Sequence, residues 1–129
     1  MRLIALRSEY QLGVEPARNR IFYQNFGPMQ TAATLPHYLA DWRAALAEMR
    51  PGFHILSDMQ VVNQVNPDLL VTFQAVELLL VQQQVGMVAE VHVPGLPTRR
   101  LSDEVTTAHA MPVRQFLSIW EAAHFLDYL

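Results

Sequence analysis

The sequence contains no cysteine and no lysine. Without cysteine the chain can form no disulfide, and it offers neither a thiolate nucleophile nor a thiolate ligand for zinc or an iron–sulfur cluster. Its basic residues are all arginines, so it also lacks the lysine amine on which Schiff-base chemistry and the common phosphate-binding loop depend. We therefore expect no cofactor.

Clustered positive charge and long hydrophobic runs are absent as well. The net charge is −3, and Arg99 and Arg100 are the only adjacent arginines. A nucleic-acid-binding surface needs a basic face, so we expect no nucleic-acid partner. The longest apolar runs, Leu69–Val71 and Leu78–Val81, are far below the roughly 18–20 residues of a membrane span, and the N-terminal run is too short for a secretory signal. We predict a cytoplasmic protein of bacterial type with no transmembrane segment.

Apolar side chains, by contrast, are plentiful: 51% of the 129 residues are hydrophobic and 16% are charged. A chain of this length normally forms one domain and buries roughly two-thirds of its unfolded surface. We expect a single domain over residues 1–129, with a core that needs no metal or disulfide.

Short runs rich in β-branched and aromatic residues predict strands. Residues 15–19, with Pro16 and Asn19, indicate a turn short enough for the strands on either side to pair as an antiparallel hairpin. The predicted strands are Tyr10–Val14, Arg20–Phe26, Phe53–Leu56, Met87–Val93 and Val113–Ser118.

Apolar residues at helical spacing, preceded by capping residues, predict helices between and after these strands. Thr31 or Thr34 can cap the first helix, with Pro36 in its first turn, while Asp41 is expected to face away from its apolar stripe. Asn66 can cap the second helix, which Pro67 and Asp68 favour further. The predicted helices are Thr31–Met49, Pro67–Gln84, Ser102–Ala110 and Trp120–Leu129.

Strands that alternate with helices favour right-handed crossovers and parallel pairing. The predicted fold class is α/β: a mixed, mostly parallel five-stranded sheet with an antiparallel N-terminal edge strand and four helices.

Three segments carry a resemblance to a known family. They are Asn25-Phe26-Gly27-Pro28, His54-Ile55-Leu56-Ser57-Asp58, and Phe116 with Trp120-Glu121-Ala122-Ala123-His124-Phe125-Leu126. Together with the element order, they resemble the STAS domain, named for sulphate transporters and anti-sigma-factor antagonists, and its SpoIIAA-like relatives. The resemblance covers about residues 10–129 and implies the same α/β fold and a regulatory, protein-binding role.

The family's phosphorylation switch uses an Asp-Ser-Ser-Gly turn about eight residues after the strand that ends in an acid. Counted from Asp58, those positions are Asn66, Pro67, Asp68 and Leu69. None of them is a serine or threonine. We therefore predict that no Ser/Thr phosphorylation switch operates at the start of the second helix.

The second predicted helix has apolar residues around most of its circumference. A buried stripe would use Leu69, Leu70, Phe73, Val76 and Leu80, together with the stem of Glu77. Val71, Leu78 and Leu79 lie off that stripe and need cover from the chain's own fold or from a partner. We predict an interaction surface comprising Ser57, Asp58, Met59, Asn66, Asp68, Val71, Leu78 and Leu79.

One polar arrangement is an alternative candidate for a metal or acid–base site. Glu90 and His92 share one face of a strand, and His54 lies in another strand. The three side chains would converge if the two strands were neighbours, although polar groups on a partly wet sheet face explain them equally well. We predict no metal site, with His54, Glu90 and His92 as the weak alternative.

No complete catalytic set is present, so we do not expect an enzyme. The first functional expectation is a STAS-like interaction module that binds a protein partner or itself as a homodimer through residues 57–82. The alternative is a domain that binds a small apolar ligand or lipid, because the many apolar residues could line a pocket.

Overall fold

A six-stranded mixed sheet forms the centre of the molecule. The computed structural model describes residues 1–62, 64–93 and 111–129. The strands follow one another across the sheet in sequence order; the first three are antiparallel neighbours and the last four are parallel neighbours. They are β1 (Arg2–Leu6), β2 (Tyr10–Glu15), β3 (Arg20–Asn25), β4 (His54–Asp58), β5 (Met87–Val91) and β6 (Val113–Phe116).

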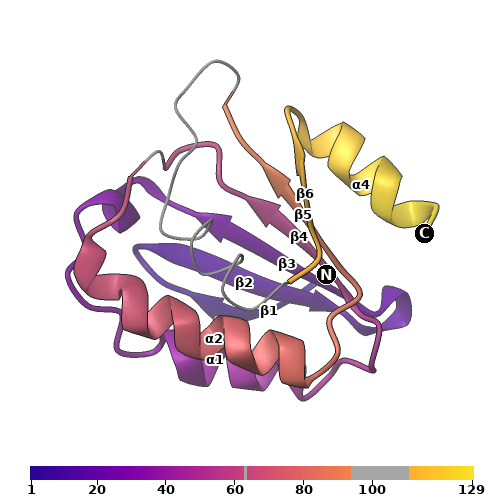
Figure 1. Ribbon diagram of the computed structural model, residues 1–129, viewed down its shortest axis with the longest axis horizontal. Helices are drawn as coiled ribbons and strands as arrows, with labels where there is room; N and C mark the ends of the chain where they lie inside the picture. Colours follow the sequence, from indigo (N-terminus) through magenta and orange to yellow (C-terminus); the bar gives the residue numbers. More distant parts are fainter. Residues whose placement is uncertain (63, 94–110) are drawn as a thin grey trace.

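Three α-helices in the described part of the chain cover the two faces of this sheet. They are α1 (Tyr38–Leu46), α2 (Leu70–Gln82) and α4 (Ile119–Asp127), accompanied by the short 3-10 turns Pro16–Arg18, Gly27–Gln30 and Pro67–Leu69. Helices α1 and α2 lie on one side of the sheet and α4 lies on the other (Figure 1). The α/β class and the mixed, mostly parallel sheet are confirmed, whereas the expected helix over Ser102–Ala110 lies outside the described residues.

The predicted hairpin is confirmed as the β2–β3 pair. Its register runs from Glu15 opposite Arg20 to Tyr10 opposite Asn25. Pro16 begins the 3-10 turn, and Asn19 closes it with a left-handed φ of 53°, a conformation that asparagine adopts more readily than most residues. The local turn chemistry therefore sets both the pairing and its register.

The predicted count of five strands is wrong, because β1 adds a sixth. This strand pairs antiparallel with β2 at the edge of the sheet, so β1 is the antiparallel edge strand. Its side chains Leu3 and Leu6 are exposed, and its register shifts between Leu3 and Ala5. Four of its five residues are apolar, yet only Ala5 is buried. The segment therefore forms a strand through its pairing with β2 and not through a buried face of its own.

The first predicted helix is too long. Helix α1 begins at Tyr38, and residues 27–30 form a separate 3-10 turn. His37, rather than Thr31 or Thr34, occupies the N-cap position, and no side-chain cap is formed. Pro36 explains the late start, because a proline allows no helical hydrogen bond from its own nitrogen and disfavours helix in the residue before it.

Each of the five predicted strands differs from the structure by one or two residues at its ends; β2 ends at Glu15, β3 at Asn25 and β6 at Phe116. β4 extends to Asp58, so Ser57 and Asp58 belong to the strand and point to opposite faces, while β5 ends at Val91.

Asn66 is the N-cap of the 3-10 turn Pro67–Leu69, and its side chain accepts a hydrogen bond from the Asp68 N–H. The α-helix that follows covers Leu70–Gln82, which is shorter at both ends than the predicted Pro67–Gln84. The capping signal of Asn66 therefore marks the turn that leads into the second helix.

Two apolar cores lie on the two faces of the sheet. The larger core joins β2, β3 and β4 to α1 and α2 and includes Tyr10, Leu12 and Ile55. The smaller core packs Ala122 and Leu126 of α4 against Leu56 and Val91. No helix in the described residues has both the length and the apolar character required to cross a lipid bilayer.

Candidate functional site

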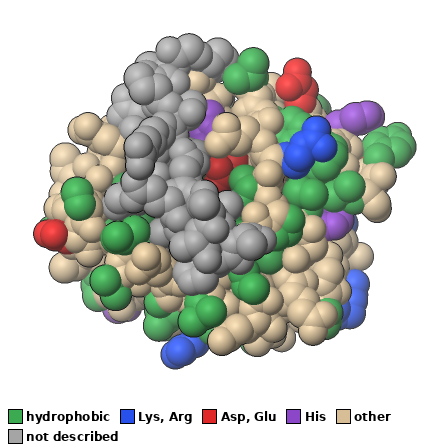
Figure 2. Space-filling view, viewed as in Figure 1, with side chains coloured by type: hydrophobic (Ala, Val, Ile, Leu, Met, Phe, Trp, Pro, Cys, Tyr) green, Lys and Arg blue, Asp and Glu red, His purple; other side chains and the backbone are tan. Residues whose placement is uncertain are grey.

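A cavity lies in the larger core, between the sheet and the α1–α2 pair. Residues of β3, β4, β5, α1, α2 and the segment after β4 line it, and its volume is about 70 Å³. One buried water needs roughly 10–15 Å³ of comparable space, so the cavity can hold several waters or a small organic group. Figure 2 shows acidic side chains near the centre of this face and hydrophobic side chains scattered over it.

Four aromatic side chains form one wall of the cavity. Tyr23 comes from β3, Tyr38 and Trp42 from α1, and Phe73 from α2. The ring centroids of Tyr23 and Trp42 are 5.4 Å apart, and those of Tyr38 and Phe73 are 5.5 Å apart. Burial raises the pKa of Tyr38 to about 12 and the pKa of Tyr23 well above its ordinary value, so both phenols stay protonated.

The sheet contributes the polar groups of the cavity. Ser57 of β4 and Glu90 of β5 are register neighbours and project from the same face. Both are buried, as is His92, whose Nε2 lies 3.1 Å from Oε1 of Glu90. Asn25 completes this side, and its side-chain oxygen accepts a hydrogen bond from the Tyr23 hydroxyl. Buried polar groups of this kind normally need partners, so their grouping marks the cavity as more than an apolar packing gap.

Helix α2 contributes a second carboxyl, that of Glu77. Burial, together with the charge of Glu90, raises the pKa of Glu77 to about 8. Among the described residues, its buried Oε2 atom has no hydrogen-bond partner. Glu77 lines the cavity, which therefore has one unmatched polar oxygen on its wall.

The weak alternative, a site made by His54 with Glu90 and His92, is not formed by the described residues. His54 pairs with Met87, whereas Ser57, three residues further along β4, pairs with Glu90. Because side chains alternate between the two faces of a strand, His54 projects from the opposite side of the sheet. Within the described residues, no group of three or more metal-ligating side chains is found.

The residues of the predicted interaction surface do not form one continuous patch. Ser57 and Met59 line the cavity, Leu79 packs against the core, and Asp58 projects from the other face of the sheet. Asn66 and Asp68 form the cap of the turn before α2. Val71 and Leu78 are exposed, with 76% and 45% of their surface accessible.

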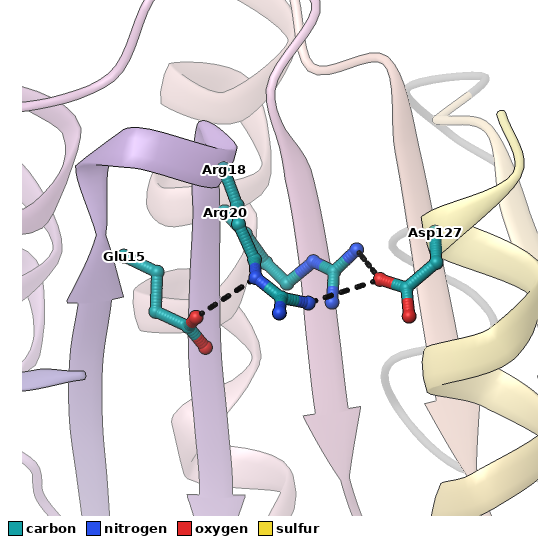
Figure 3. A network of polar contacts seen from close by, with 4 residues as sticks. All are labelled: Glu15, Arg18, Arg20 and Asp127. Atoms are coloured by element: carbon teal, nitrogen blue, oxygen red, sulfur yellow. Dashed lines mark hydrogen bonds and ion pairs between the residues drawn. The ribbon is translucent and has the colours of Figure 1, made fainter.

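A separate polar network attaches α4 to the start of β3. Asp127 of α4 accepts hydrogen bonds from the buried Arg20, at 2.8 Å, and from Arg18, at 3.2 Å (Figure 3). Arg18 also contacts Glu15. The hydrogen bond from Arg20 holds the pKa of the Asp127 carboxyl below its ordinary value. This network lies on the α4 side of the sheet and plays a structural part.

Sequence reasoning missed the part that Glu77 and the aromatic residues play in the cavity. Glu77 was placed on the buried stripe of its helix, but only for its aliphatic stem. A carboxyl on an otherwise apolar buried face is itself a signal, because a carboxyl without a partner is costly to bury. Tyr23, Tyr38 and Trp42 carry no local mark that distinguishes a cavity wall from ordinary core.

Comparison with known proteins supplies no family for the chain. No protein-family model matches it. Searches of the curated proteins and of the solved structures likewise find no match. The resemblance to STAS domains therefore stays a prediction, and the function has to be argued from the site itself.

Proposed function

We propose that this chain is a non-catalytic domain that binds a small molecule in the cavity between the sheet and helices α1 and α2. The observation that carries the proposal is the combination of an aromatic wall with buried polar groups in a cavity of about 70 Å³. Ligand pockets are typically apolar with a few well-placed polar groups, and this cavity has that composition.

The unmatched Glu77 oxygen favours a ligand over an empty packing defect. A buried acceptor or donor without a partner costs about 1–3 kcal/mol. The buried Glu77 oxygen carries such a cost. A ligand with complementary groups would offset it, whereas an apolar void would not.

Ligand-observed NMR with a library of small fragments tests the proposal. Val76→Phe adds bulk on the face of α2 that lines the cavity, and Val81→Phe makes the same change at an exposed position of the same helix. We expect fragments that bind the wild type to be lost in Val76→Phe and retained in Val81→Phe. Absence of binding by any fragment, or equal binding by folded forms of both variants, would contradict the proposal.

A second candidate function is a STAS-like interaction module that associates with itself through α2. The observation that favours it is an exposed apolar stripe made by Val71, Leu78 and Val81. Their spacing of seven and then three residues places them on one side of the helix. Light scattering over a range of concentrations tests this candidate, which requires a dimer that dissociates on dilution. A monomer at every concentration would exclude the homodimer.

A further inference from the structure

We infer that the cavity is built for a small uncharged carboxamide, a primary amide group on a short apolar chain. This inference rests on the proposed binding function and names its ligand class. It comes from the unmatched oxygen of Glu77, the apolar side chains around it and the size of the cavity.

The Glu77 carboxyl determines the preferred charge of the ligand. Its Oε2 atom is buried, and no described residue donates a hydrogen bond to it. An ionised carboxylate is costly in such surroundings and takes up a proton instead. In agreement, burial and the charge of Glu90 raise the pKa of Glu77 to about 8. At neutral pH the group is therefore an uncharged carboxylic acid, which favours an uncharged ligand.

The hydrogen-bonding groups of that acid match those of an amide. A protonated carboxyl presents one donor and one acceptor side by side, and a primary amide presents the complementary N–H and carbonyl oxygen. The two groups can form two parallel hydrogen bonds, which satisfy the unmatched Glu77 oxygen. A ketone of the same shape can form only one of these bonds. A carboxylate has no donor and must also bury its charge.

The rest of the cavity determines the remainder of the ligand. Phe73, Val76 and Leu80 of α2 line it, and Tyr23 and Ile55 reach it from the sheet. These side chains offer apolar surface against which a hydrocarbon chain can be buried. A volume of about 70 Å³ holds only several water-sized groups, so the chain is short, roughly three to six carbons.

Binding of an amide should depend on the protonation of Glu77. The other titratable groups around the described part of the cavity are Tyr23 and Tyr38, whose phenols stay protonated, and Glu90 with the adjacent His92. An amide that accepts the Glu77 proton binds the protonated form more tightly than the ionised form. Its affinity therefore has its full value well below pH 8 and falls as pH rises through 8.

Three ligands of the same shape test the ligand class: butanamide, 2-pentanone and butanoate. They differ only in the NH₂, CH₃ or O⁻ group on the carbonyl carbon, and NMR measures the dissociation constant of each. At pH 7 we expect butanamide to bind about threefold to tenfold more tightly than 2-pentanone, the effect of one added hydrogen bond, and butanoate to bind most weakly. Butanamide affinity should fall at least about fivefold from pH 7 to pH 9.5, as expected for a linked proton.

Two substitutions show whether the Glu77 carboxyl recognises the amide. Glu77→Gln keeps an uncharged donor and acceptor, so it should bind butanamide within about threefold of wild type and lose the fall at high pH. Glu77→Met keeps the length of the side chain without its oxygens, so the preference for butanamide over 2-pentanone should disappear. The exposed Glu121→Gln is the matched control and should behave as wild type does. Circular dichroism at each pH checks that the proteins compared are folded.

The outcomes separate the ligand class from the binding function. If 2-pentanone or butanoate binds as tightly as butanamide and Val76→Phe abolishes binding, the amide class is wrong while the cavity still binds ligands. The amide class also fails if butanamide affinity does not fall at high pH, or if library fragments bind and butanamide does not. If neither the three ligands nor the library binds, both proposals fail. If a Glu77 variant does not fold, the ranking and pH dependence of wild type still decide the ligand class.

Discussion

Single carboxyl groups in this molecule have opposite titration behaviour because their surroundings differ. Asp41 on α1 is buried, yet hydrogen bonds from Arg7 and Tyr10 outweigh the effect of burial and lower its pKa. No described residue donates a hydrogen bond to the buried Oε2 atom of Glu77, and the pKa of Glu77 rises to about 8. Burial alone therefore does not decide the charge of a carboxyl; the donors that reach it do.

The raised pKa of Glu77 predicts that stability falls as pH rises. The ordinary pKa of this carboxyl is 4.5, so between pH 4.5 and 8 the folded state retains a proton that the unfolded state has lost. The contribution of the protonated Glu77 carboxyl to the stability of the folded state is complete below pH 4.5 and disappears as pH rises through 8. We expect Glu77→Gln to be more stable than wild type by over ~1 kcal/mol at pH 8.5, with a smaller difference at pH 5.

Urea unfolding at the two pH values measures this effect. Glu121→Gln, at an exposed position of α4, is the control and should show no comparable dependence on pH. A difference between Glu77→Gln and wild type that stays constant from pH 5 to pH 8.5 would contradict the prediction.

Asp41 supports the opposite prediction at acid pH. It accepts two hydrogen bonds from Arg7, at 2.9 and 3.0 Å, and one from the Tyr10 hydroxyl at 2.5 Å. Because its pKa is lowered, its contribution is present above pH 3.8 and is lost as pH falls through the lower folded-state value. We expect Asp41→Asn to cost about 1–3 kcal/mol at pH 7 and much less at pH 2.5.

Thermal unfolding at both pH values, followed by circular dichroism, measures the effect of Asp41→Asn. Asp68→Asn, at an exposed position in the turn before α2, is the comparison and should change stability by under ~1 kcal/mol. Equal losses of stability in the two variants at pH 7 would mean that the hydrogen bonds from Arg7 and Tyr10 to Asp41 contribute nothing to stability.

At the scale of elements, one close backbone contact decides how α2 leads into β5. A Cβ atom at Gly86 would lie 2.5 Å from the carbonyl oxygen of Gly52. The clash involves backbone, which cannot rotate away as a side chain could. We expect Gly86→Ala to cost about 1–3 kcal/mol. Gly27→Ala is the matched control, since a Cβ there meets no atom within 4 Å, and urea unfolding compares the two.

Helix α4 depends on its polar attachment as well as on its apolar face. Asp127→Asn would leave the buried Arg20 without its carboxylate, while Arg18→Gln would remove a largely exposed contact. Loss of a charge partner is costly for a buried group, and exposed ion pairs contribute little. We expect Asp127→Asn to speed hydrogen exchange in α4 more than Arg18→Gln does. Equal exchange rates would show that the apolar face alone holds the helix.

At the scale of the whole molecule, the sheet separates two different halves. Its α1–α2 side contains the cavity and its aromatic wall, while its other side carries the smaller core and the Arg20–Asp127 contact. The outer side of α2 adds the exposed stripe of Val71, Leu78 and Val81. The same helix thus contributes to both candidate functions, one through each of its faces.

Two adjacent leucines allow self-association to be separated from folding. Leu78 is exposed, and Leu79 packs against the larger core. We expect Leu79→Glu to lose at least ~2 kcal/mol of stability and Leu78→Glu to stay folded. If α2 mediates a dimer, light scattering will show wild type as a dimer and Leu78→Glu as a monomer. A dimer that persists in Leu78→Glu would place the contact elsewhere.

The sequence by itself determined most of the secondary structure that the described residues contain. Asn66 and Pro67 begin the turn that leads into the second helix, the Pro16–Asn19 turn joins the hairpin, and the alternation of strands and helices gives the α/β class. These features depend on residues within a few positions of one another. Local hydrogen bonds, backbone geometry and apolar periodicity are therefore enough to predict them.

Only the tertiary structure decided what depends on distant residues. Edge strand β1 exists through its pairing with β2, and the β4–β5 register places Ser57 beside Glu90 while turning His54 to the other face. The unmatched Glu77 oxygen appears only when α2 lies over the sheet. Strand register and mutual burial are set by contacts between segments far apart in the chain, and no local pattern encodes them.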